Sequence, residues 1–244
     1  MKLIQRFLTK IISSFVFCIH SINASLPFTT PLCYIGVVNG RRSMTNIEKI
    51  KTIIVTNRGY ITRKDMDDNN ISSWFFTNFI RKNHLVKIDK GFYAEKSWLV
   101  DDYLVFQYKY PKYIFSYQCA LYLHHLTDRI PFQIEVTGSA NYRPMGNKKT
   151  NVKKHVEKND LVYSLGITKS KTDFGYIVNV YDMEKTICDL IKHRKDIDSE
   201  IFIKALKLYN NSKLKNTHNL FKYAKIMKIE DKVFDIMEIV SNGN

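Results

Sequence analysis

The sequence lacks the residue groupings on which most enzyme sites depend. Its 9 glycines form no glycine-rich phosphate loop, and no His, Cys, Asp or Glu cluster has the spacing of metal ligands. Its 4 cysteines show no CxxC pair and no paired spacing (Cys18, Cys33, Cys119 and Cys188). We therefore expect no catalytic site, metal or cofactor. The scattered cysteines favour a reduced, cytoplasmic chain.

Acidic residues are scarce relative to basic ones. The chain has 38 Lys and Arg against 23 Asp and Glu, which gives a net charge of +15. Such an excess favours a polyanionic partner, although a lysine-rich, AT-biased proteome would produce the same composition. With 244 residues, 45% of them hydrophobic, the chain suits one large domain or two small ones. It contains no Gly/Ser-rich linker, internal repeat or low-complexity tract.

Residues 1–43 contain no acid at all. They carry a charge of +5, which leaves +10 for the remainder. Their apolar run, residues 11–19, is too short to span a bilayer as a helix. Three basic residues precede this run and Asn23-Ala24-Ser25 resembles a cleavage site, so the stretch imitates a signal peptide.

Met44 supports a different interpretation of these first residues. Thr45 and Glu48, directly after it, have the spacing of a capping box at the start of a helix. Arginine and glycine codons can be purine-rich, so Gly40-Arg41-Arg42-Ser43, directly before it, is compatible with a ribosome-binding site read as protein. Our hypothesis is that residues 1–43 are a non-native leader from a mis-assigned start. A secretory leader and a disordered or membrane-associated tail are the alternatives, and the intact mass of the native protein decides between them.

Residues 44–96 have the order of parts of a winged helix-turn-helix, which is helix, turn, helix and a two-stranded wing. The first helix is expected over about residues 47–55, with Ile47, Ile50 and Ile54 on its inner side. Thr62 and Asp65 have capping-box spacing for the second helix. The cluster Asp67-Asp68-Asn69-Asn70 ends it, because such side chains compete for backbone hydrogen bonds.

Residues 72–83 are the expected recognition helix. Ser72 or Ser73 can cap it, and helical spacing places Phe76, Phe79 and Ile80 toward the core. The opposite side carries Ser73, Trp74, Thr77, Asn78 and Arg81. That face has the chemistry to contact base edges and phosphates.

The ribbon 85–93 is the predicted wing, with a turn at Asp89-Lys90-Gly91 in which Gly91 can take a positive φ. Basic side chains around the recognition helix are expected to hold phosphates: Arg58, Arg63, Lys64, Lys82, Lys87 and Lys90. The expected partner is double-stranded operator DNA, an inverted repeat if two copies bind. A small helical module that docks protein is the alternative.

Residues 97–244 are predicted to form a mixed domain with a small β-sheet and a C-terminal helical bundle, so the whole fold is α+β. Strands are expected at 132–137, 161–167 and 176–181. N-caps are expected at Asp101, Ser116 and Asp182. Core stripes mark three final helices, 198–209 (Ile201, Ala205, Leu208), 216–227 (Leu220, Tyr223, Ala224, Met227) and 230–240 (Val233, Ile236, Met237, Val240).

Two polar groups in this part have two interpretations each. A basic stretch is either a second nucleic-acid surface or a solvated loop (Arg143, Lys148, Lys149, Lys153, Lys154, His155 and Lys158). Glu184, Asp189 and His193 on one helix suggest acid–base chemistry, but capping and an i,i+4 charge pair explain them more simply. A nuclease-like enzyme within residues 100–200 is the least favoured hypothesis.

Four stretches resemble one protein family. They are Gly59-Tyr60-Ile61-Thr62-Arg63-Lys64-Asp65, Lys90-Gly91-Phe92-Tyr93, Ser116-x-x-x-Ala120-Leu121-Tyr122-Leu123-x-x-Leu126-Thr127-Asp128-x-Ile130-Pro131, and Asn179 to Leu190. Their order is similar to that in the AbiEi family, antitoxins of AbiE-type abortive-infection, type IV toxin–antitoxin systems. The resemblance covers about residues 45–240. It departs at Tyr117 and Cys119, where relatives often carry His and Ser.

The resemblance implies a two-part antitoxin that acts in phage defence. Its DNA-binding winged helix would be the transcriptional repressor of the shared operon. Its C-terminal domain would antagonise a nucleotidyltransferase toxin without a stable complex. A cytoplasmic protein with no membrane partner and no enzyme activity is implied. The alternatives are a winged-helix interaction module and a transcriptional regulator unconnected to a toxin.

Overall fold

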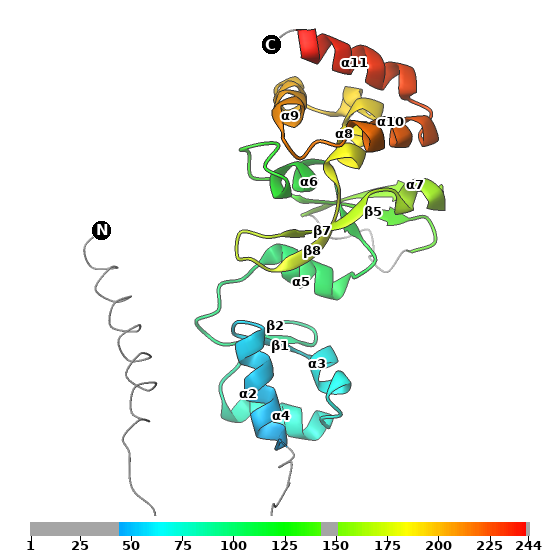
Figure 1. Ribbon diagram of the computed structural model, residues 1–244. Helices are drawn as coiled ribbons and strands as arrows, with labels where there is room; N and C mark the ends of the chain where they lie inside the picture. Colours follow the sequence, from blue (N-terminus) through cyan, green and yellow to red (C-terminus); the bar gives the residue numbers. More distant parts are fainter. Residues whose placement is uncertain (1–43, 143–150, 243–244) are drawn as a thin grey trace, which may run out of the picture. The chain divides into compact units, whose positions relative to one another are not determined.

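The computed structural model describes residues 44–142 and 151–242, which form a mixed α+β structure with two small sheets (Figure 1). The predicted leader, residues 1–43, lies outside the described residues, as do Arg143, Lys148 and Lys149 of the basic stretch. Within the described ranges, no helix combines the length and apolar character that a bilayer span requires.

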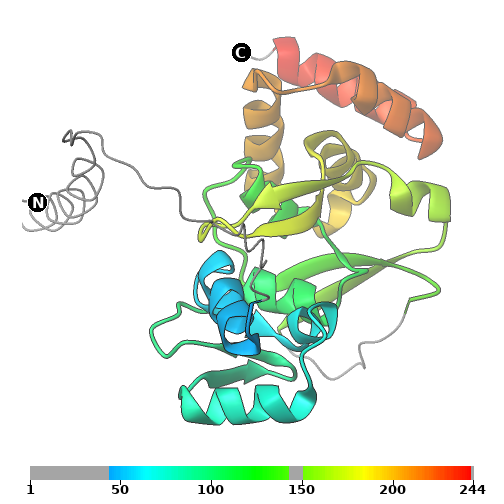
Figure 2. The same ribbon diagram turned by 60° about the horizontal axis from the view of Figure 1, so that its bottom comes forward.

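Residues 44–96, the N-terminal segment, contain three helices (Figure 2), each with an N-terminal cap. Capping boxes at Thr45 and Thr62 start the first two helices, and the Ser72 side chain accepts a hydrogen bond from the Phe75 N–H in the third. These caps satisfy orphan N–H groups of the first turn, so the local sequence fixes where each helix begins. The elements are α2 (Asn46–Thr56), β1 (Tyr60–Thr62), α3 (Arg63–Asp68), α4 (Ser73–Lys82), β2 (Val86–Asp89) and β3 (Phe92–Ala94).

The three strands of the N-terminal segment pair in the order β1-β3-β2, with both pairs antiparallel. Gly91, with φ +77°, forms the turn between β2 and β3 as predicted. The helices and sheet enclose a core of buried apolar side chains: Ile50, Ile54, Ile61, Met66, Ile71, Phe76 and Phe79. Ile47 was expected in this core, but it lies in the first turn of α2 and is 48% exposed.

Residues from 97 onward, the C-terminal segment, contain a five-stranded sheet in the order β6-β5-β4-β8-β7. The β4–β5 and β7–β8 pairs are antiparallel, whereas β4–β8 and β5–β6 are parallel. Helix α5 packs beside the sheet through Phe106, which shares a buried cluster with Phe115 and Val180. The elements are α5 (Asp102–Lys109), β4 (Ile114–Phe115), α6 (Tyr117–Leu123), β5 (Ile134–Ser139), β6 (Val152–Glu157), α7 (Asp160–Ser164), β7 (Ile167–Lys171) and β8 (Ile177–Tyr181).

The last helices gather around α8 in a second cluster of the C-terminal segment (Figure 1). Asp182 caps α8 as predicted, and the stripe Leu220, Tyr223 and Ala224 is buried as predicted. Leu208 was expected in the core but is 38% exposed, and Leu206 is buried in its place. The elements are α8 (Met183–Lys192), a 3₁₀ turn η1 (Arg194–Asp196), α9 (Ser199–Asn211), α10 (Thr217–Ile226) and α11 (Glu230–Asn242).

Two further predictions for the C-terminal segment were wrong. The strand expected at 161–167 is instead the short helix α7, because the Asn159 side chain caps the N–H groups of Leu161 and Val162. Part of the expected basic loop is the strand β6. Ser116 is the N-cap residue of α6 as predicted, but its side chain makes no cap hydrogen bond, and its Oγ instead accepts a hydrogen bond from Thr137 Oγ1 at 2.9 Å.

Candidate nucleic-acid interface

Helix α4 carries most of the predicted base-contacting residues, and the core fixes its orientation. Phe76 and Phe79 are 1% and 8% exposed, and Phe76 meets the Tyr93 ring edge-on with centroids 5.4 Å apart. Ile80 packs against the same cluster. Since these side chains occupy one side of the helix, rotation of α4 about its axis would expose an aromatic core. The polar side is therefore held outward.

Four of the five residues predicted for the outward side of α4 are exposed, and the fifth, Asn78, is half-buried. Trp74 is 75% exposed, and Ser73, Thr77 and Arg81 are also exposed. Arg81 Nη2 donates a hydrogen bond to Asn78 Oδ1 at 3.0 Å, and Thr77 Oγ1 donates one to the Ser73 carbonyl at 2.9 Å. The Asn78–Arg81 pair presents a donor-rich guanidinium beside an amide, which is a suitable combination for purine edges.

Helix α3 contributes two of the predicted phosphate-holding residues. Arg63 Nη2 donates a hydrogen bond to Ser73 Oγ, and its Nε lies 3.7 Å from Asp67 Oδ1. This contact brings the start of α3 to the start of α4. Lys64 is exposed and has no ion-pair partner among the described residues. Arg63 and Lys64 therefore extend the positive surface from α4 onto α3.

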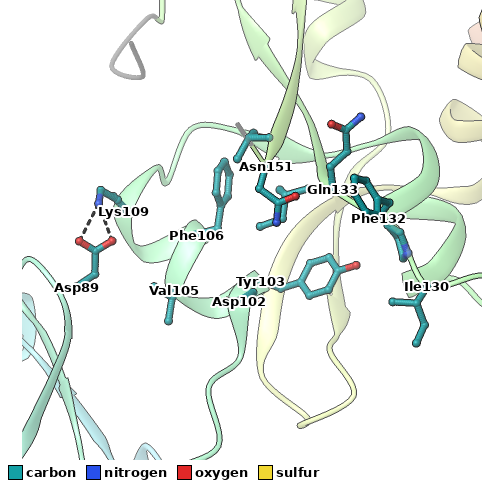
Figure 3. Close-up of a pocket in the computed structure, with 13 residues that line it drawn as sticks. Asp89, Asp102, Tyr103, Val105, Phe106, Lys109, Ile130, Phe132, Gln133 and Asn151 are labelled. Atoms are coloured by element: carbon teal, nitrogen blue, oxygen red, sulfur yellow. Dashed lines mark hydrogen bonds and ion pairs between the residues drawn. The ribbon is translucent and has the colours of Figure 1, made fainter. Parts of the chain in front are cut away.

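The β2–β3 hairpin and the end of α4 supply the remaining lysines. Lys82, Lys87 and Lys90 are all exposed. Asp89 lies between the two hairpin lysines in sequence, and its carboxylate is neutralised by Lys109 Nζ at 2.6 Å (Figure 3). The hairpin turn therefore carries a net positive charge.

Arg58 is the one predicted phosphate-holding residue that the structure directs elsewhere. It has a positive φ of 59°, and its Nη1 donates a hydrogen bond to the Phe174 carbonyl at 3.3 Å. Phe174 belongs to the turn between β7 and β8. The structure therefore joins Arg58 to the C-terminal segment and does not group it with the side chains of α4.

The predicted basic stretch is partly neutralised within the fold. Lys153 Nζ lies 2.8 Å from Glu135 Oε1, and that carboxylate is 2% exposed. The nearby Glu157 lies 3.9 Å from Lys192 Nζ. Lys154 and Lys158 have no ion pair among the residues that the structure describes. This pairing weakens the case for a second nucleic-acid surface on β6.

The acidic residues of α8 are buried and are used in structural contacts. The i,i+4 charge pair on this helix forms between Lys185 and Asp189, with Nζ–oxygen distances of 2.6 and 2.7 Å. Burial raises the pKa of Asp189, and the Lys185 charge opposes that shift. Glu184 accepts hydrogen bonds from Tyr209 and from the Asn216 N–H. These contacts join α8 to α9 and α10.

Comparison with known proteins does not assign the chain to a family. The sequence matches no protein-family profile and no curated protein. The structure is similar to the crystal structure of the RV2827C protein from Mycobacterium tuberculosis. That match has 11% sequence identity and a TM-score of 0.49, and it covers 72% of this chain and 70% of that one. A likeness at this level identifies neither family nor function.

Two residues of α5 beside the hairpin, Tyr108 and Lys109, were not predicted from the sequence. Tyr108 Oη donates a hydrogen bond to the Gly91 carbonyl at 3.1 Å, and Lys109 binds Asp89. A cavity of about 540 Å³ opens next to the Asp89–Lys109 pair (Figure 3). Phe132 at its edge is 94% exposed. The lining residues, all within the described ranges, include no Ser, Cys or His.

A half-buried histidine gives the C-terminal segment a pH dependence that can be tested. Burial lowers the pKa of His155 to about 4, and its ring stacks on Tyr117 at a centroid distance of 3.9 Å. The unfolded chain binds a proton near its ordinary pKa of about 6.5, so between about pH 6.5 and 4 the unfolded state holds more protons. The contribution of His155 to the free energy of unfolding is therefore fully present above about pH 6.5 and is lost as the pH falls toward 4.

We expect this loss to be about 1–2 kcal/mol for His155, less than a fully buried imidazole would give. Urea unfolding at pH 7.5 and pH 4.5 measures it. The variant His155→Gln should reduce the difference between the two pH values, whereas His218→Gln serves as a matched histidine control on α10. An unchanged pH difference in His155→Gln would rule out this origin.

Proposed function

We propose that residues 44–96 are a winged helix-turn-helix that binds double-stranded DNA. The order of elements supports this proposal: α2, β1, α3, α4 and then the β2–β3 hairpin, with β1 completing the sheet. The observation that carries it is the outward polar side of α4, with a positively charged hairpin beside it, in a chain of net charge +15.

In this proposal α4 enters the major groove. Trp74, Thr77, Asn78 and Arg81 meet base edges, and Ser73 lies at the groove entrance. Cationic side chains around α4 hold phosphates, because they bind phosphate without reporting the base sequence: Arg63, Lys64, Lys82, Lys87 and Lys90. Two copies on an inverted repeat would place half-sites about one helical turn apart, or a multiple of that distance.

We further propose that the chain is the antitoxin of a type IV, AbiE-type system and represses its own operon. The four stretches that resemble the AbiEi family support this part of the proposal. The C-terminal segment would then antagonise a nucleotidyltransferase toxin without a stable complex. Co-expression with the product of an adjacent nucleotidyltransferase gene tests it. Restored growth supports the antitoxin role, and continued growth arrest contradicts it.

Two substitutions on α4 separate base recognition from phosphate binding. Asn78→Ala should reduce discrimination between operator and unrelated DNA by about 1–3 kcal/mol, because an amide contact to a base edge is lost. Lys82→Ala should weaken binding to both DNAs alike and reduce the slope of log K against log salt by about 1. Fluorescence anisotropy with a labelled duplex from upstream of the Met44 codon measures both effects.

Lys232→Ala is the matched lysine control, since Lys232 is exposed on α11 in the C-terminal segment. It should leave affinity and specificity unchanged. If Asn78→Ala keeps full operator selectivity, α4 does not contact the bases in the way proposed.

One observation favours a second candidate function, a protein-docking module. Trp74 is 75% exposed on the outward side of α4, and tryptophan is enriched in the energetic centres of protein interfaces. In that case the winged helix would bind a protein partner in place of DNA. The two functions differ in their response to salt, as set out below.

A further inference from the structure

The turn of the β2–β3 hairpin is held from outside the N-terminal segment. Lys109 Nζ lies 2.7 and 2.6 Å from the two carboxylate oxygens of Asp89 (Figure 3). Tyr108 Oη donates a hydrogen bond to the Gly91 carbonyl at 3.1 Å. Both donors lie at the end of α5, so adjacent residues of one helix contact both sides of Lys90.

The fit at this turn is close. The Gly91 carbonyl also accepts a hydrogen bond from the Arg63 N–H at 2.7 Å, which links the turn to the start of α3. A Cβ added to Gly91 would lie 3.1 Å from Tyr108 Oη and 3.3 Å from Arg63 Cβ. The turn therefore lies between α3 and α5, and its backbone has little room to move.

A second set of contacts joins the same two segments. Tyr176 Oη of the C-terminal segment donates a hydrogen bond to the Arg58 carbonyl at 3.4 Å. Trp98 Nε1, in the same segment as Tyr176, donates a hydrogen bond to Tyr176 Oη at 2.8 Å. The rings of Tyr60, Phe92 and Trp98 pack together, with centroids 4.8 to 5.8 Å apart. These contacts, together with those of Tyr108 and Lys109, hold the segment that contains α5 against the hairpin.

The outer side of this hairpin is the part that gains most from such contacts. In the sheet order β1-β3-β2, β2 is an edge strand that pairs with β3, and ordering its turn upon binding would reduce affinity. The outer strand, β2, has exposed side chains at Val86 and Lys87 and a register shift between Lys87 and Asp89. Contacts from α5 would order the turn before any ligand arrives.

We propose that Tyr108 and Lys109 are positioning residues for the wing: they fix the β2–β3 turn, and so Lys90, in the place from which it meets a phosphate. The inference rests on the proposed DNA-binding function. Neither residue contacts DNA in this arrangement. Their effect on binding comes from the order that they impose on the hairpin.

Hydrogen exchange of the full chain tests the ordering without DNA. Tyr108→Phe removes one hydrogen bond, worth about 1 kcal/mol, and should speed exchange in residues 85–95 about fivefold while α8 is unaffected. Lys109→Met should have a similar local effect. The matched controls are Tyr122→Phe, whose hydroxyl bonds Asp173 at 2.6 Å, and Lys204→Met, whose Nζ lies 2.6 Å from Asp128. Neither control should change exchange in residues 85–95.

A charge swap gives a rescue. Lys109→Glu should speed exchange of the hairpin, and adding Asp89→Lys should restore protection because the ion pair is rebuilt in reverse. If Tyr108→Phe and Lys109→Glu leave exchange in residues 85–95 at the wild-type rate, α5 does not order the hairpin and the inference is wrong.

DNA binding separates this inference from the proposed function. Tyr108→Phe changes no charge, so it should weaken binding of the upstream duplex about fivefold without changing the salt slope. Wild-type affinity in Tyr108→Phe would overturn the positioning role alone. Absence of binding by the wild-type chain would overturn the proposed function, while exchange would still show whether α5 orders the hairpin.

Discussion

Replacing Lys185 with methionine should lower the free energy of unfolding by about 3–5 kcal/mol, because it leaves a carboxylate buried without its partner. The Lys185 and Asp189 side chains are 3% and 8% exposed, and Nζ lies 2.6 Å from Oδ1. Nζ is also 4.5 Å from the centroid of the Tyr181 ring. Urea unfolding followed by circular dichroism measures the loss.

The variant should also acquire a distinctive pH dependence. Burial already raises the pKa of Asp189, and removal of Lys185 takes away the charge that opposes this shift. The folded variant then keeps a proton that the unfolded chain releases above about pH 4. The contribution of Asp189 to stability should therefore be greatest at low pH and be lost as the pH rises through its folded pKa, a dependence that the wild-type chain measured alongside does not share.

Two comparisons control for the chemistry of the change. Lys204→Met removes an ion pair whose side chains are 43% and 72% exposed and should cost less than about 1 kcal/mol. The double variant Lys185→Met, Asp189→Leu should recover most of the lost stability, since a matched apolar pair replaces the buried ions. Equal losses in Lys185→Met and Lys204→Met would show that the buried pair has no special role.

Raising potassium chloride from 50 to 200 mM should weaken DNA binding about 500-fold, if five phosphate contacts each contribute a slope of about −0.9. The five are Arg63, Lys64, Lys82, Lys87 and Lys90, which surround the outward side of α4. Arg58 is left out because its guanidinium is bound to the Phe174 carbonyl. Anisotropy titrations of the labelled upstream duplex at several salt concentrations give the slope.

The double variant Lys87→Ala, Lys90→Ala should reduce the magnitude of that slope by about 2, because two counterion-releasing contacts are removed. Lys232→Ala again serves as the control. A change of less than tenfold over the same salt range would contradict phosphate binding and favour the protein-docking function of α4. The salt titration is therefore the most direct choice between the two candidate functions.

Local signals in the sequence predicted the local structure of the N-terminal segment. The Thr45–Glu48 and Thr62–Asp65 spacings gave capping boxes, and helical periodicity placed Phe76 and Phe79 inward and Trp74 outward. Such features depend on neighbours within one turn, so they are visible in a single chain. The DNA-binding role of that outward side stays a prediction.

Predictions failed where a distant partner decided the outcome. The polar sequence of β6 gave no strand signal, yet all six of its residues pair with β5. Lys185 lies one turn before Asp189 and His193 one turn after it. In the folded chain Asp189 pairs with Lys185, and both side chains are buried. The Asp89–Lys109 and Arg58–Phe174 contacts join positions that no local pattern relates, so the support of the hairpin could not be foreseen.

The 2 tryptophans of the chain lie in contrasting surroundings. Trp74 projects into solvent from α4, whereas Trp98 is packed against Tyr60 and Phe92 with its indole N–H bonded to Tyr176. The protein therefore carries two native fluorophores, one at the surface proposed to meet DNA and one where the two segments touch. Replacing either with phenylalanine isolates the emission of the other, and ligand quenching and segment separation can then be followed as separate optical signals without any attached dye.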